Sequence, residues 1–412
     1  MFEYTPFIRT SDAELRGVEH LEEYIKDRIT PFFILTKSKM LTSRALDKLE
    51  EGRRVVSGSV QGSLNNIGCK FGRNRPFFLD IATDSIPNHQ EMIQIKNDFY
   101  KRKAKENKAD IPFDARQYEW VKEMRGLVSS DEGYKNWCDF VAQAKIDFPF
   151  MIPVLQFSAQ DAEEDPIPDF LEQVNFLSNQ FPLFAFRLQR PSTKSNWLDV
   201  GEYLVHKICQ HDISGKVVII IDLAFLSPIG RGREELLKKV RYFIGVCRSL
   251  EVKDVIVTGS SFPQSVYELV DQKEDEGVIS SQMLQIFEQL ADTGIKYGDY
   301  AFIHPQKFSS SARGWIPRID IPLSGKLFFR KQRKGKNDAY ARVYEDIAYY
   351  LIEEGRLFEV PDCWGRSCIL RAGNGEGVGP QTQQGASPSF WISVRLNIHI
   401  TSICIDRKIF TN

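Results

Sequence analysis

A set of polar side chains stands at the ends of short apolar runs, where residue type and position together could form a site. Asp80 and Asp222 are carboxylates suited to general acid–base chemistry, and His304 is an imidazole that titrates near neutral pH. Cationic and amide side chains at equivalent positions suit a phosphate or a carboxylate. The candidate catalytic residues are therefore Asp80, Asp222 and His304. The candidate ligand-binding residues at the other run ends are Arg9, Lys37, Gln156, Arg187, Gln189 and Ser260.

A structural role explains the same residues in a simpler way. Strand ends meet water, so polar residues accumulate there whatever the protein does. An ion pair such as Arg187 with Asp222 would then only close the end of the fold. The sequence leaves these two interpretations open.

The elements that must hold these residues repeat along the chain. Each unit is a short apolar run, usually followed by a segment with helical periodicity, which is typical of a parallel sheet with crossover helices. Eight such units close a (β/α)8 barrel, in which functional groups gather at the carboxyl ends of the strands. We therefore predict an α/β fold, a TIM-like (β/α)8 barrel. The eight runs are 4–9, 31–36, 76–82, 152–157, 184–189, 217–223, 254–258 and 299–304.

Two stretches depart from this repeat. The interval 88–145 is too long for one crossover helix, and we predict a helical insertion after the third strand. From about residue 314 the segments 316–321, 327–330, 367–371 and 389–405 alternate apolar and polar residues, as half-buried antiparallel strands do. The chain thus divides into a barrel over residues 1–314 and a C-terminal α+β unit over residues 315–412.

We expect the C-terminal unit to pack on the barrel near its functional end, with Trp391 buried. Its glycine-rich stretch 373–388 is predicted to be a mobile, lid-like loop. Alternation places His399 on a polar face with Thr401. His399 is either a satisfied polar-face residue or a further ligand-binding candidate turned toward the barrel mouth.

Composition narrows the class of partner. With 54 basic and 55 acidic residues the formal net charge is −1, so no overall field attracts nucleic acid. Two basic segments, Lys101 to Lys108 and Lys331 to Lys336, could touch it locally, but aromatic residues are not interleaved in them. Seven scattered cysteines indicate a reduced cytoplasm, and no apolar stretch is long enough to span a membrane.

Motifs for metals and nucleotides are weak, and the residues do not indicate a cofactor. Cys363 and Cys368 have no second pair at a zinc spacing, and His206 and His211 project in different directions on a helix. No metal site is expected. The run GNGEGVG at 373–379 is not followed by a helix start, so it does not predict a phosphate cradle.

Several short motifs, in order, resemble the beta protein family, which takes its name from a protein attributed to phage T4. They are YTPFIR at 4–9, PFFIL at 31–35, YGDY at 297–300, Cys363 and Gly365 before the glycine-rich stretch, Trp391, and NIHIT at 397–401. The family usually has an acidic residue closing the second strand, whereas Thr36 and Lys37 stand there in this chain. The resemblance implies a phage or phage-defence context and no particular reaction.

Two classes of function follow. The first is a recognition protein in phage–host conflict that binds a protein or a phosphorylated ligand at the barrel mouth. The alternative is a hydrolase of a phosphoester or nucleotide-like substrate, acting through Asp80, Asp222 and His304. A nucleic-acid effector using the basic segments is a third class. Whether the protein is an enzyme stays open at this level.

Overall fold

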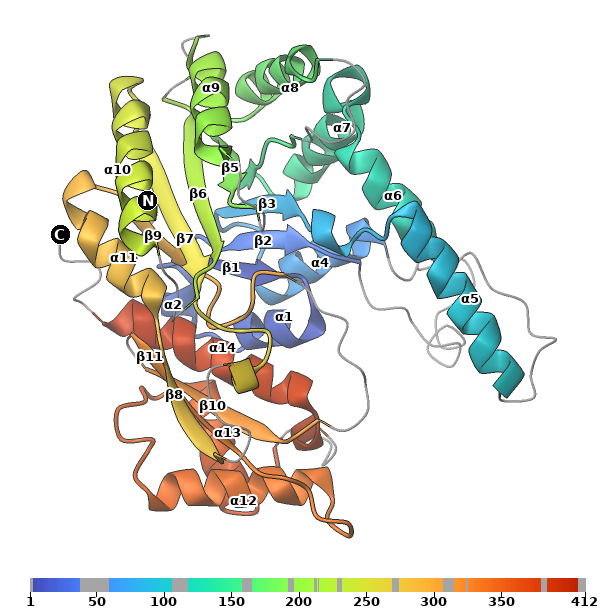
Figure 1. The fold of residues 1–412 in the computed structure, drawn as a ribbon, viewed down its shortest axis with the longest axis vertical. Coiled ribbons are helices and arrows are strands. Elements are labelled where there is room, and N and C mark those ends of the chain that lie inside the picture. Colours follow the sequence, from blue (N-terminus) through green and yellow to red (C-terminus); the bar gives the residue numbers. More distant parts are fainter. Residues whose placement is uncertain are drawn as a thin grey trace.

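The computed structural model shows a barrel with a smaller α+β unit attached to one side (Figure 1). The residues that it describes are 3–37, 59–105, 118–157, 165–191, 196–210, 213, 215–227, 232–268, 274–306, 315–323, 325–378 and 384–406.

The barrel consists of eight parallel strands in the order β4-β3-β2-β1-β9-β7-β6-β5. The sheet closes where Val154 bridges Ala185 and the N–H of Leu155 donates to the Ala185 carbonyl at 2.8 Å. The predicted TIM-like barrel is therefore confirmed. Its strands are β1 (Tyr4–Arg9), β2 (Phe32–Leu35), β3 (Phe77–Ile81), β4 (Met151–Pro153), β5 (Phe184–Gln189), β6 (Val217–Phe225), β7 (Asp254–Ser260) and β9 (Lys296–Asp299).

The eighth barrel strand lies earlier in the sequence than predicted. β1 pairs with β2 and β9, as expected, but β9 ends at Asp299 instead of beginning there. Gly298 makes this strand hard to recognise in the sequence, because glycine is uncommon in strands. Glycine is needed at this position, since a Cβ atom here would lie 2.9 Å from the Thr5 carbonyl oxygen. The polar residue that closes the last strand is therefore Asp299, and His304 lies in the loop beyond it.

Apolar side chains fill the barrel because its strands are covered on both faces. In β6 the first seven residues are buried, five of them valine or isoleucine. Stacked rings of Phe7, Phe32 and Phe78 occupy the interior, with centroids 4.2 Å and 5.9 Å apart. The helices packed outside are α1 (Asp12–Glu19), α2 (Glu23–Lys26), α4 (Val60–Lys70), α8 (Ile167–Gln180), α9 (Trp197–Cys209), α10 (Arg233–Ser249) and α11 (Gln282–Leu290).

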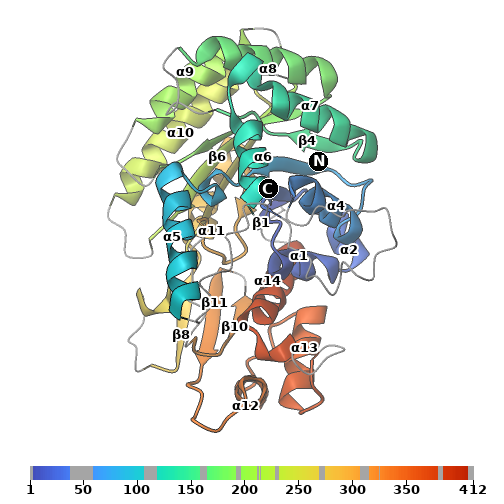
Figure 2. The same ribbon diagram turned by 90° about the vertical axis from the view of Figure 1, so that its right-hand side faces the viewer.

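The predicted insertion between the third and fourth strands is helical. It contains α5 (His89–Lys105), α6 (Glu119–Val128) and α7 (Asp131–Asp147). None of the residues of α5 is buried, and the helix projects away from the barrel (Figures 1 and 2). The basic segment from Lys101 to Lys108 begins in the last turn of α5, and its residues 106–108 lie outside the described residues.

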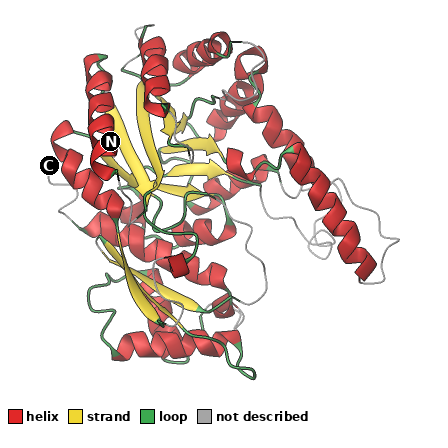
Figure 3. Cartoon of the chain, viewed as in Figure 1, coloured by secondary structure: helices red, strands yellow, loops and turns green. Residues whose placement is uncertain are grey.

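The C-terminal unit contains an antiparallel sheet and three helices (Figure 3). The sheet order is β10 (Arg318–Leu323), β11 (Lys326–Lys331) and β8 (Glu276–Ser280), so one strand comes from a point in the chain before residue 314. The helices are α12 (Tyr340–Glu353), α13 (Trp364–Gly373) and α14 (Pro388–Ile405). The strands predicted at 367–371 and 389–405 were wrong, because both segments are helical.

Helix α14 joins the unit to the barrel. Leu396, Ile400 and Ile403 belong to the barrel core, whereas Trp391 and Ile398 belong to the core of the C-terminal unit. Trp391 is only 3% exposed, which confirms that it is buried. Among the described residues, no helix has the length and apolar character needed to cross a membrane.

Candidate functional site

The centre of the barrel mouth is an ion-pair network around Arg187 on β5. Its Nε and Nη2 atoms donate to Oδ2 of Asp222 at 3.0 Å and 2.8 Å, and its Nη1 donates to Oδ2 of Asp80 at 2.7 Å. The guanidinium also lies over the rings of Phe7 and Phe32. We call Asp80, Gln156, Arg187, Gln189, Asp222 and Tyr300 the Arg187 cluster.

Every acidic oxygen in this cluster accepts hydrogen bonds. Asp222 is fully buried, and its Oδ2 also accepts from the Tyr300 hydroxyl at 2.6 Å and from Gln189 Nε2 at 3.1 Å. The other oxygen of Asp80 accepts from Gln156 Nε2 at 2.9 Å. The backbone of Gln156 is held in turn by Gln173, whose side chain both accepts and donates. Five predicted residues are thus brought together.

Arg187 and Tyr300 keep their protons over the ordinary pH range. Burial alone would lower the pKa of Arg187, but Tyr300, Asp222 and Asp80 raise it well above its usual value. Burial and the neighbouring Asp222 carboxylate raise the pKa of Tyr300 as well. Arg187 therefore stays cationic and Tyr300 stays protonated.

Two strands that reach the mouth end in the same strained turn. The Oδ1 atom of Asp222 accepts the N–H of Ala224 at 2.9 Å, and Oδ1 of Asp299 accepts that of Ala301 at 3.0 Å. Both alanines have left-handed backbones, with φ of 53° and 46°. In β6 this turn is a bulge that shifts the register before Phe225. Because non-glycine residues rarely adopt this conformation, such strain commonly marks functional sites.

Two adjoining cavities open beside the cluster. A small one of about 50 Å³ is lined by Arg9, Asp84, Arg187 and Gln189, among others. A larger one of about 260 Å³, which we call the mouth pocket, is lined by Arg190, Pro191, Leu223, Ala224, Phe225, Gln264, His304 and Gln306. Gln306 borders both cavities.

The remaining predicted residues occupy different positions. Arg9 pairs with Asp84 at 2.6 Å and donates to the Pro305 carbonyl. The Ser260 hydroxyl donates to the Ile303 carbonyl at 2.7 Å and so fixes the loop after β9. Lys37 lies away from the cluster, with Nζ 4.7 Å from the ring centroid of Trp120 in the insertion.

His304 borders the mouth pocket and is not part of the cluster. Its ring lies against Phe225, with the centroids 5.1 Å apart. Nδ1 lies 3.1 Å from the backbone nitrogen of Gln306 and 3.4 Å from its carbonyl oxygen, so this backbone can pair with either tautomer of the ring. Burial lowers the pKa of His304, so the imidazole is neutral at pH 7.

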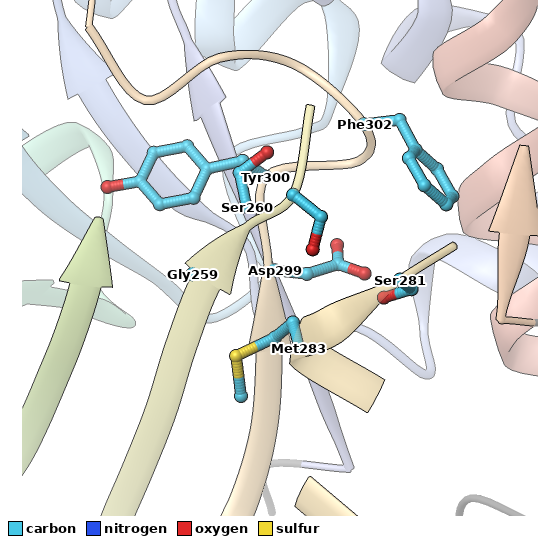
Figure 4. Close-up of a pocket in the computed structure, with 8 residues that line it drawn as sticks. Gly259, Ser260, Ser281, Met283, Asp299, Tyr300 and Phe302 are labelled. Carbon is cyan, nitrogen blue, oxygen red and sulfur yellow. The ribbon is translucent and has the colours of Figure 1, made fainter. Parts of the chain in front are cut away.

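One of the two interpretations of the sequence turned His399 toward the barrel mouth. In the structure the side chain is not directed at the Arg187 cluster. It reaches from α14 to Asp299, and its Nε2 lies 2.8 Å from Oδ2. The same carboxylate accepts from the hydroxyls of Tyr4 at 2.7 Å and Tyr297 at 2.8 Å. Figure 4 shows Asp299 and Tyr300 on opposite sides of the chain, beside a cavity of about 10 Å³ that could hold one water.

Sequence reasoning missed Asp299 and Tyr300 as members of these networks. The signal was the YGDY stretch at 297–300, which was noted only as a family landmark. Because the last strand was placed too late, Asp299 was assigned to its start, where no functional group is expected.

The chain is similar to a known phage protein. A sequence model described as Beta protein matches residues 4–404. "Protein beta" of Enterobacteria phage P4 is 23% identical over 406 residues, covering 97% of this chain and 92% of the phage protein. The relative comes from phage P4 and not from T4, the source expected above. No solved structure matches the chain significantly. Over almost its whole length, therefore, the chain belongs to the Beta protein family, which includes a phage protein.

Proposed function

We propose that this protein is a recognition protein that acts in phage–host conflict by binding a phosphorylated ligand in the mouth pocket. One observation carries the proposal. The charged groups of the Arg187 cluster pair with one another, whereas a cavity of about 260 Å³ beside them is lined by hydrogen-bond donors and an aromatic ring.

The chemistry of the lining suits a ligand with one anionic and one flat apolar part. Arg190 supplies a guanidinium, and His304 supplies an imidazole ring. Gln264 adds an amide to this polar side. Phe225, with Leu223, supplies apolar surface for a ring. A nucleotide combines both parts and is our first choice of ligand class.

Binding is favoured over hydrolysis by the same geometry. A general base must be free to take a proton from a water or a substrate. Asp80 and Asp222 instead accept hydrogen bonds from Arg187 within the barrel, and Nδ1 of His304 contacts the backbone of Gln306. Hydrolysis through these three residues remains the alternative.

The proposed role in phage–host conflict rests only on sequence similarity to a phage protein. The similarity to protein beta of phage P4 extends over 97% of the chain and supports a role during infection, in attack or in defence. Membership of a family does not name the ligand.

The direct test is ligand binding by the full chain. Nucleoside mono-, di- and triphosphates, sugar phosphates and inorganic phosphate are titrated by calorimetry and by thermal shift. At least one nucleotide should raise the melting temperature, and Arg190→Ala should weaken its binding about tenfold or more. The matched control is Arg73→Ala, which removes an exposed arginine paired with Asp147.

The outcomes are separable. If no phosphorylated compound binds, or if Arg190→Ala binds as well as the wild type, the mouth-pocket proposal is wrong. If a bound compound is turned over and Asp222→Asn abolishes turnover while the variant stays folded, the hydrolase alternative replaces it.

A further inference from the structure

We propose that the C-terminal unit binds single-stranded nucleic acid through a surface formed by Trp315, Arg333, Lys334, Lys336 and Tyr340. We call it the Trp315 surface. It includes the loop from β11 to α12, which lies at the end of the molecule opposite the barrel in both views (Figures 1 and 2). The proposal is independent of the mouth pocket.

The surface begins with an aromatic platform. Trp315 stacks on Tyr340 with the ring centroids 4.3 Å apart and the planes within 19°. The indole is 37% exposed, although tryptophan is costly to leave in water. A ring held flat by one stacking partner presents its other face to a base, and such stacking tolerates any sequence.

Cations surround this platform. The Nζ atom of Lys334 lies 5.5 Å from the centroid of the Tyr340 ring, and Arg333 and Lys336 are exposed in the same loop. In the part of the chain that the structure describes, no salt bridge joins Arg333, Lys334 or Lys336 to a carboxylate. Nζ of Lys334 donates to the Gly335 carbonyl at 3.2 Å. The nearby Asp338 carboxylate instead accepts the N–H of Gly335 at 2.8 Å.

This geometry removes the objection that the sequence raised. The run from Lys331 to Lys336 lacks aromatic residues, but folding brings Trp315 and Tyr340 to its side. Lys331 itself is buried and is not part of the surface. Positive charge next to a flat ring is the combination that binds single strands without reading their sequence.

The other basic surface, on α5, fits a base less well. There Phe99 and Tyr100 meet edge to face at 79°, so they form no flat stack. The cations Lys101, Arg102 and Lys105 near them provide charge without a platform. α5 therefore serves as a charge-matched control.

The experiment measures fluorescence anisotropy of labelled oligonucleotides with the full chain, over a range of salt concentrations. The probes are a 12-nucleotide DNA, the same sequence as RNA, its DNA duplex, and heparin as a polyanion without bases. Both single strands should bind more tightly than the duplex. Comparing the affinities of the DNA and RNA strands shows whether the 2′-hydroxyl contributes to binding. Trp315→Ala should weaken single-strand binding about tenfold and leave heparin binding unchanged.

Charge variants test the second half of the surface. Replacing Arg333, Lys334 and Lys336 by Gln should lower the slope of log affinity against log salt by about 2. The loop is exposed, so this triple variant should keep the wild-type melting temperature. The matched controls are the triple Gln variant of Lys101, Arg102 and Lys105, and Tyr242→Ala for an exposed ring that is 65% accessible.

Several results would overturn the proposal: no single-strand binding at low salt, equal losses in the α5 variant, or a wild-type affinity in Trp315→Ala. Binding of heparin alone would reduce the surface to a nonspecific polyanion contact and would also count against it.

Discussion

Nε2 of His399 lies 2.8 Å from Oδ2 of Asp299, and this contact joins helix α14 to β9, the last strand of the barrel. Both side chains are buried, and two tyrosine hydroxyls complete the coordination of the carboxylate. The last barrel strand is therefore held by a segment that begins only at Pro388.

The first prediction concerns this carboxylate. Asp299→Asn should lower the free energy of unfolding by about 3 kcal/mol, because a buried charged partner is lost. Urea unfolding followed by tryptophan fluorescence measures it. The control is Asp292→Asn, whose partner Arg241 is exposed and whose loss should leave the urea midpoint nearly unchanged. Equal effects of the two variants would show that the His399 contact contributes nothing.

Acid sensitivity follows from the same contact. Burial by itself would raise the pKa of Asp299, but His399 and Tyr4 lower it below its usual value. A carboxyl group with a depressed folded-state pKa adds stability above its unfolded-state pKa of about 3.9, and this stability is lost as the pH falls through the folded value. The free energy of unfolding of Asp299→Asn should therefore fall less steeply below about pH 4 than that of the wild type.

The opposite sign is expected for Glu14. Burial raises its pKa to about 7, although hydrogen bonds from the Arg9 backbone and from Ser11 act against this. Stability from the protonated form is fully present below the unfolded-state pKa of about 4.3 and is lost as pH rises to the folded value. Glu14→Gln should flatten this decline, which is worth about 3 kcal/mol. The control Glu119→Gln, at an exposed site, should follow the wild-type curve.

The Arg187 cluster provides a test by coupling. Arg187→Met should destabilise the fold by several kcal/mol because it leaves Asp80 and Asp222 buried without their cation. Combining it with Asp222→Leu should cost less than the sum of the two single changes, since the second removes the charge that the first left unpaired. A double-mutant cycle of unfolding free energies measures the difference. Simple additivity would mean that the two side chains do not interact.

The barrel could be predicted from sequence because most of its strands are apolar runs, such as that of β6. The C-terminal helix α14 could not be predicted from the sequence. α14 is buried on nearly all sides, including Arg395, Asn397 and His399, so its polar residues mark no solvent face and the helical period is hidden. Its accidental alternation from Leu396 to Ile403 then resembles a strand.

The candidate site was predictable only in part, for a related reason. Asp80, Arg187 and Asp222 end well-marked strands, so the sequence placed them in one mouth, where they form one cluster. Tyr300 and the Asp299 network depend on the exact end of β9, which Gly298 conceals. The mouth pocket depends on the bulge before Phe225, a local backbone feature without a sequence signal of its own.

The strained turns predict a gain in stability from a smaller residue. Ala224→Gly and Ala301→Gly should each raise the free energy of unfolding by up to about 1 kcal/mol, because glycine adopts a left-handed backbone without steric cost. Ala144→Gly, near the C-terminal end of α7 and away from its irregular first turn, is the matched control and should lower it by about 1 kcal/mol. If Ala224→Gly also weakens ligand binding in the mouth pocket, the strain serves to hold Phe225 in place. Destabilisation by all three changes would show that the turns store no strain.

The last prediction concerns α14 as a whole. A chain ending at Ser387 lacks Leu396, Ile400 and Ile403, which belong to the barrel core, and Trp391 and Ile398, which belong to the other core. Both cores would then be open to water at once, and exposed apolar surface of this size leads to aggregation. The truncated chain should accumulate in the insoluble fraction, whereas a chain ending at Asp406 should stay soluble and unfold cooperatively. Light scattering and thermal unfolding distinguish the cases. A soluble, cooperatively folding chain ending at Ser387 would mean that the barrel closes without its last helix, and that the His399–Asp299 contact is an addition to a fold already complete.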